Sequence, residues 1–176
     1  MKKIILISLM LAAISACSPV LNSELMKQGV RDVTLSQVLQ SPEGYKGKLF
    51  ILGGVIIETR FVETGSQIEA LSVPVDAYGY LGDIGHSSER FLALYPREKG
   101  LLDPFVYYTG REITLAGEFI EVRKSKIDEM EYFYPVFAVR EIYLWEEPME
   151  SYVSPYPYPY VYYNLYTYGP LFPYDP

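Results

Sequence analysis

Five segments of the chain alternate apolar and polar side chains with the two-residue period of a β-strand. They span residues 47–60, 66–76, 89–96, 111–124 and 131–145. The first segment is apolar on both faces, which predicts a strand that is buried on both sides or bends sharply. Gly53–Gly54 and Gly117 lie near the middle of the first and fourth segments, where glycine permits a bulge or a bend. Bent strands favour a closed barrel over a flat sandwich, because closure removes the exposed sheet edges.

Short helices are expected at two points outside these strands. Residues 34–46 predict a helix that Thr34 caps and that ends near Ser41–Pro42. Residues 97–110 predict a helical turn that begins at Asp103–Pro104, with Asp as the cap and Pro in the first helical position. Five strands with a short helix after the third are the layout of an OB-type barrel. The expected fold class is therefore all-β, a small five-stranded OB-like barrel with one or two short helices.

The N-terminus has the pattern of a secretion signal. Lys2–Lys3 precede the apolar run at residues 4–14, which is followed by the small residues Ser15–Ala16. A membrane-spanning helix needs ~20 apolar residues, so this run is too short to be one. We therefore expect residues 1–16 to be a signal peptide that is removed from the mature chain.

Cys17 is the only cysteine in the 176 residues, and it directly follows Ile14-Ser15-Ala16. An aliphatic residue, two small residues and cysteine form a bacterial lipobox, in which the thiol receives an S-diacylglyceryl group. Cleavage before the cysteine then frees an α-amine for N-acylation. The alternative is an ordinary signal peptide that ends near a cysteine by chance. A disulfide within one chain is excluded, because Cys17 has no second cysteine to pair with.

Two acyl chains anchor a protein stably to a membrane, whereas one binds marginally. We therefore expect membrane attachment through the lipid on Cys17. The next residue is Ser18 rather than the Asp that retains enteric lipoproteins in the inner membrane, which favours the outer membrane.

The composition disfavours nucleic acid as a partner. The chain carries a formal charge of −7, and removal of the signal peptide takes away two lysines, so the mature surface repels phosphates. An OB-type barrel binds its ligands on the face of strands two and three, here residues 68–75 and 89–95. This face offers Phe91 and Tyr95 for stacking but only Arg90 as a base.

Composition divides the chain into four parts. We expect a signal peptide (1–16), a lipidated polar tether (17–33), the barrel domain (34–147) and a Tyr/Pro-rich tail (148–176). The tail holds nine of the eighteen tyrosines, and its prolines withhold the backbone donors that a helix or inner strand needs. Disorder or polyproline II is expected there. Two interpretations stay open: a tail of biased composition, or an aromatic strip that binds a membrane interface, a glycan or a protein.

His86 is the only histidine, and its neighbours Asp83 and Glu89 could complete a metal site if their loop folded back. Such spacings also arise by chance in polar loops, and no second histidine or cysteine supports the site, so we predict no metal. The chain has no G-x-S-x-G nucleophile elbow, which excludes the usual serine triad of a hydrolase.

Two charged groups in loops also have structural interpretations. The acidic residues Asp128, Glu129 and Glu131 suggest either paired catalytic carboxylates or, as we prefer, a solvated hairpin turn between lysines. Arg111 is expected to pair with Asp103 across the loop before the fourth strand.

Several motifs together resemble the Slp family of outer-membrane lipoproteins, which is named for starvation-induced expression in enteric bacteria. Besides the lipobox cysteine, the matching segments are YKGKLFILGGVI (45–56), RFLALYP (90–96), LLDPFVYYTGREITLAGEF (101–119) and YFYPVFAVREIYLW (132–145). The resemblance covers residues 35–145, about two-thirds of the chain, and leaves out the Tyr/Pro-rich tail.

The resemblance implies a lipid-anchored protein of the outer membrane of a Gram-negative bacterium. Together with the absence of a catalytic motif, it leads us to expect a non-enzymatic structural or interaction module that faces the periplasm and needs no cofactor. Its partners would be the membrane and an envelope protein or glycan. The alternative is a periplasmic lipoprotein that binds a small ligand or peptidoglycan.

Overall fold

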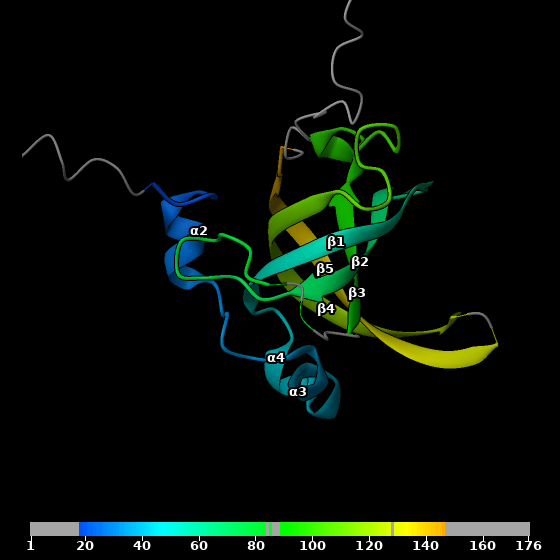
Figure 1. Cartoon of the computed structure of the whole chain (residues 1–176). Coiled ribbons are helices and arrows are strands. Elements are labelled where there is room, and N and C mark those ends of the chain that lie inside the picture. Colours follow the sequence, from blue (N-terminus) through cyan, green and yellow to red (C-terminus); the bar gives the residue numbers. More distant parts are fainter. Residues whose placement is uncertain (1–17, 84, 86–88, 128, 147–176) are drawn as a thin grey trace, which may run out of the picture. The chain divides into compact units, whose positions relative to one another are not determined.

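The computed structural model describes residues 18–83, 85, 89–127 and 129–146. Five strands form a closed barrel in the order β1-β2-β3-β5-β4 (Figure 1), which confirms the all-β, OB-like expectation. All neighbouring strands are antiparallel except β3 and β5, whose parallel pairing closes the barrel. The strands are β1 (Leu49–Val62), β2 (Gly65–Val73), β3 (Arg90–Pro96), β4 (Glu112–Ile127) and β5 (Met130–Leu144).

The mid-strand glycines have two different roles. Gly117 adjoins a register shift between β4 and β5, as expected of a bend. The shift in β1, however, lies between Ile56 and Glu58, so a bulge at Gly53–Gly54 is wrong, and a bend there stays a prediction. Gly53 instead permits close packing, because a Cβ there would lie only 2.5 Å from Leu81 Cδ2.

Phenylalanine fills the interior of the barrel. Phe137 lies at the centre, with its ring centroid 5.4 Å from that of Phe50, 6.0 Å from that of Phe91 and 5.6 Å from that of Phe119. All four side chains are at most 1% exposed. Rings without polar atoms can be buried from every side, so these four form the main core.

The helix that closes one end of the barrel comes from before the first strand. In α3 (Leu35–Gln40), Thr34 and Gln37 form a capping box, and Leu35 and Val38 join the phenylalanine core. The expected 34–46 helix is thus divided at Ser41 into α3 and α4 (Pro42–Tyr45). Figure 1 shows both helices at one end of the barrel.

At the other end, the segment between β3 and β4 forms turns. A short 3₁₀ helix, η2 (Arg97–Lys99), is followed by the expected helical turn at Asp103, whose carbonyl accepts from Tyr107 N at 2.8 Å. The Asp103 carboxylate accepts from Phe105 N at 2.8 Å, as a cap should. Leu102 is buried, and Tyr107 packs against the main core.

Most of residues 17–33, expected to be a free tether, packs on the barrel instead. This stretch forms α2 (Ser23–Gln28), which Asn22 caps by accepting from Glu24 N at 2.8 Å. Leu21 and Met26 are buried against Ile51 and Ala116. A six-residue helix is too short to show a sustained period, which is why the sequence pattern suggested a tether. Its packing also explains why β1 is apolar on both faces.

The chain divides into two units after Glu146. The signal peptide and the tail both lie outside the described residues. Within the described ranges, the helices are all too short or too polar to cross a bilayer.

Candidate functional site

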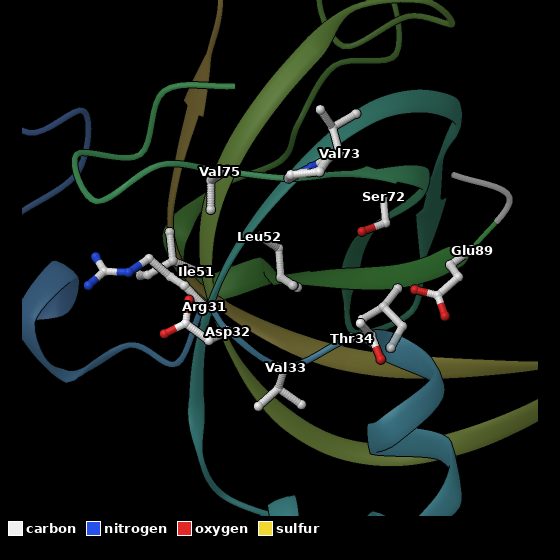
Figure 2. Close-up of a pocket in the computed structure, with 12 residues that line it drawn as sticks. Arg31, Asp32, Val33, Thr34, Ile51, Leu52, Ser72, Val73, Val75 and Glu89 are labelled. Carbon is white, nitrogen blue, oxygen red and sulfur yellow. The ribbon is translucent and has the colours of Figure 1, made fainter. Parts of the chain in front are cut away.

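A pocket of about 390 Å³ opens on the outside of the barrel, beside the connection between α2 and α3 (Figure 2). Its walls come from this connection, from β1, from the end of β2 and from the residue before β3. The lining residues are Arg31, Asp32, Val33, Thr34, Leu35, Ile51, Leu52, Ser72, Val73, Pro74, Val75 and Glu89.

The pocket has an apolar floor and a charged rim. Leu52 lies near its centre in Figure 2, and the guanidinium of Arg31 points away from it. Arg31 Nη1 donates to the carbonyls of Met26 and Ala77, each at 3.1 Å, so it links α2 to the loop after β2. The Glu89 carboxylate accepts from the backbone N–H of Ser36 at 2.9 Å and from its hydroxyl. The pocket can therefore hold the apolar part of a small ligand, while Arg31 and Glu89 on its rim have structural partners.

A second polar cluster lies where β3 meets β5. Glu69 Oε1 accepts from Arg90 Nη1 at 2.8 Å and from the Tyr134 hydroxyl at 3.0 Å. Burial, and then the hydrogen bond to Glu69, raise the pKa of Tyr134 to about 12. The same carboxylate raises the pKa of Arg90 above its ordinary value. The cluster joins β2, β3 and β5 and so stabilises the parallel closure of the barrel.

These contacts change the expected ligand face of strands two and three. Arg90, its only base, is paired with Glu69. Phe91 was expected on this face for stacking, but it is fully buried in the barrel core, because its side of the strand points inward. Tyr95, the other expected stacking residue, is half-buried and packs against the same core.

Cys17, His86 and Asp128 lie outside the described residues. Glu89 caps α3, as described above, and the described parts of residues 18–146 hold no cluster of three metal-ligating side chains.

Of the acidic group, the described residues Glu129 and Glu131 lie at the hairpin turn between β4 and β5, as preferred above. Ile127 pairs with Met130 across that turn, and Lys124 Nζ lies 2.7 Å from Glu131 Oε1. Arg111 Nη2 donates to the carbonyl of Trp145 at 2.6 Å, with the guanidinium 5.4 Å from the centre of the Tyr108 ring. The pairing of Arg111 with Asp103 stays a prediction.

Sequence reasoning missed an aromatic surface around Trp145. The Trp145 ring lies 5.5 Å from the ring of Tyr80 and 5.0 Å from that of Tyr143, measured between centroids. Its Nε1–H donates to Thr114 Oγ1 at 3.0 Å, and the buried Thr114 hydroxyl donates to Gly79 O at 2.9 Å. The signal in the sequence was the YGY triplet at 78–80 and the lone tryptophan at the end of the last strand.

The described part of the chain is a closed five-stranded barrel, and it follows an N-terminal sequence with the pattern of a lipoprotein signal. The chain belongs to the outer membrane lipoprotein Slp family, whose model matches residues 14–172. The match begins within the lipobox and includes most of the Tyr/Pro-rich tail. The estimate that the resemblance ends at Trp145 was therefore too short.

A protein of Haemophilus influenzae (strain ATCC 51907 / DSM 11121 / KW20 / Rd), described as uncharacterized, is 30% identical over 95 residues. The alignment spans 53% of this chain and 50% of that protein, so the chain matches about half the length of this relative. Among solved structures, a mitochondrial single-stranded DNA-binding protein of S. cerevisiae aligns at a TM-score of 0.33 and 7% identity. That alignment covers 58% of this chain and 99% of the other.

Proposed function

We propose that the mature protein begins at Cys17, carries lipid on its sulfur and α-amine, and serves as a non-enzymatic interaction module on the periplasmic face of the outer membrane. The observation that carries this proposal is the lipobox Ile14-Ser15-Ala16-Cys17 at the end of the signal peptide. Membership of an outer-membrane lipoprotein family supports it. The contacts of Glu69 and Glu89 support the non-enzymatic part of the proposal. Glu69 links β2 to β3 and β5, and Glu89 accepts hydrogen bonds from Ser36 in the first turn of α3, so both carboxylates have structural roles.

Replacement of the nucleophile tests the anchor. Cys17→Ser should abolish palmitate labelling and release the protein from the outer-membrane fraction, because no thiol remains to receive the diacylglyceryl group. A processed Cys17→Ser protein that still labels and stays in the outer membrane would contradict the proposal.

The residue after the cysteine tests the destination. Ser18→Asp should move the labelled protein to the inner membrane if enteric-type sorting applies. The same change at the exposed Ser23, in the first turn of α2, is the matched control and should leave the protein in the outer membrane. Protease treatment of intact cells then tests the orientation, since a periplasmic domain should resist digestion until the outer membrane is opened.

The pocket beside β1 favours a second candidate, the binding of a small ligand or a glycan such as peptidoglycan. Val33→Phe would fill the pocket from one wall and should reduce retention on peptidoglycan sacculi. Val62→Phe, at a half-buried position at the end of β1, is the matched control. Equal retention of both variants on sacculi would contradict this pocket as the glycan site. If removal of residues 152–176 abolished retention, glycan binding would be assigned to the tail.

A further inference from the structure

The folded domain begins almost at the lipidated residue. Val20 N donates to the carbonyl of Tyr78 at 2.9 Å, and Leu21 is buried against the barrel. Three residue steps separate Cys17 from Val20, which an extended chain spans in at most about 11 Å. The first attached point of the domain therefore cannot move far from the lipid, and it lies at the loop that carries Tyr78 and Tyr80.

This loop belongs to an exposed aromatic surface, which we call the anchor-side surface and define as Tyr78, Tyr80, Tyr143 and Trp145. The three tyrosines are 46%, 48% and 39% exposed. Trp145 contacts two of them, Tyr80 and Tyr143, by its ring. The side chains come from the loop after β2 and from the end of β5, far apart in sequence.

Hydrogen bonds hold the backbone beneath the anchor-side surface in one arrangement. Asp76 Oδ1 accepts from Tyr78 N at 2.8 Å and from Tyr80 N at 2.9 Å, which sets the turn. The buried Thr114 hydroxyl connects Gly79 O to Trp145 Nε1. The surface is therefore preorganised and needs little ordering when it binds.

We infer that the anchor-side surface lies in the headgroup layer of the bilayer that holds the lipid on Cys17, so that the barrel rests against the membrane. The inference rests on the lipid attachment proposed above. A bilayer is about 40–45 Å thick around a hydrocarbon core of about 30 Å, which leaves about 5–8 Å of headgroups on each side. A reach of about 11 Å from the acyl-bearing residue places Val20 in or just above this layer. Tyrosine and tryptophan are the side chains that favour it.

Charge selects the kind of lipid. The chain is acidic overall, and two arginines bond to the backbone here: Arg31 donates to the carbonyls of Met26 and Ala77, and Arg111 donates to that of Trp145. Asp76 lies in the same loop. The contact therefore comes from aromatic rings at a zwitterionic surface and not from attraction to anionic headgroups, so it should persist at high salt.

Trp145 is the only tryptophan in the chain and belongs to the anchor-side surface, so its fluorescence reports the contact. The full-length lipidated protein is reconstituted into phosphatidylcholine vesicles with and without lipids brominated near the glycerol end of the acyl chains. Co-sedimentation with the vesicles measures anchoring independently. We expect the anchored protein to lose Trp145 emission to the brominated lipid and to become less accessible to aqueous acrylamide than in detergent, in low and high salt alike.

The double variant Tyr78→Ser/Tyr80→Ser should still co-sediment but lose most of this quenching. The matched control is Met130→Ser/Phe133→Ser, which removes two exposed apolar side chains from the β4–β5 hairpin and should be quenched like the unmodified protein.

The outcomes separate the two proposals. Protein that co-sediments while Trp145 stays unquenched and open to acrylamide overturns the inference and leaves the lipid anchor intact. Quenching that disappears in high salt, or that survives the double tyrosine variant, overturns it as well. Protein that carries palmitate on no residue and does not co-sediment contradicts the lipid anchor itself.

Discussion

The aromatic residues inside the barrel and those on the anchor-side surface differ in chemistry. The interior cluster around Phe137 consists of phenylalanines, whose rings have no polar atom and are buried on all sides. The anchor-side surface consists of tyrosines and a tryptophan, whose polar atoms need water or a partner. In these two regions the fully buried rings are phenylalanines and the exposed rings carry a polar atom, whereas elsewhere Phe133 is exposed and Tyr134 is buried, so ring type favours a location without fixing it.

The largest effect on stability is expected from removal of a phenylalanine ring at the centre of the barrel. Phe137→Ala removes the ring that contacts Phe50, Phe91 and Phe119, and should lower the free energy of unfolding by about 3–5 kcal/mol. Urea denaturation measures the effect. Phe133→Ala, at an exposed position four residues earlier on β5, should change it by less than about 0.5 kcal/mol. Similar losses for both variants would show that the interior is not the main source of stability.

The stability of the protein at alkaline pH tests the role of Tyr134, a tyrosine that is buried. The pKa of Tyr134 is raised to about 12 in the folded state from an ordinary value of 10.0. Below pH 10 Tyr134 keeps its proton in both the folded and the unfolded state, so the free energy of unfolding has its full value. Between pH 10 and 12 only the unfolded state loses the proton, so the free energy of unfolding falls as the pH rises. The two-unit shift corresponds to a loss on the order of 2–3 kcal/mol.

The Tyr134→Phe variant has no phenol to ionise at this position. Its free energy of unfolding should therefore not show the loss that Tyr134 causes between pH 10 and 12. Burial also raises the pKa of Tyr107, but that group is present in both proteins and cancels in the comparison. Unfolding measured at pH 9 and pH 12 gives the result, and equal declines in both proteins would contradict the role assigned to Tyr134.

A smaller effect is expected at the buried Thr114 hydroxyl beneath the anchor-side surface. Thr114→Val keeps the shape of the side chain but removes the acceptor of Trp145 Nε1–H and the donor to Gly79 O. The free energy of unfolding should fall by about 1–3 kcal/mol, and Trp145 should become more accessible to acrylamide. Unchanged stability and quenching would show that Thr114 does not hold the anchor-side surface in place.

The smallest effect on folding is expected from Tyr80→Ser. The ring is nearly half exposed and contributes one contact with Trp145, so thermal denaturation should show a loss of about 0.5–1.5 kcal/mol. If the loss approached that of Phe137→Ala, Tyr80 would belong to the core, and the distinction between the two aromatic regions would fail.

Local patterns were sufficient for the strands and for some of the turns. Alternation located all five strands, Gly117 adjoins a bulge, and Asp103–Pro104 begins a helical turn, because these features depend on neighbouring residues. The double glycine at 53–54 was misjudged, because its reason is the approach of Leu81 from a distant loop. Residues 18–33 were misjudged too, since the partners of Leu21 and Met26 are Ile51 and Ala116.

The strand content, the acidic charge and the lipobox motif can all be read from the sequence without a structure, and they predict an exported lipoprotein with a small barrel. Composition, residue period and local motif carry that information without any long-range contact. The packing of α2 on the barrel, the inward direction of Phe91 and the meeting of Tyr80 and Tyr143 at Trp145 become visible only in the folded protein. Each of these depends on which segments meet when the barrel closes, and a pattern along one segment does not encode its partner.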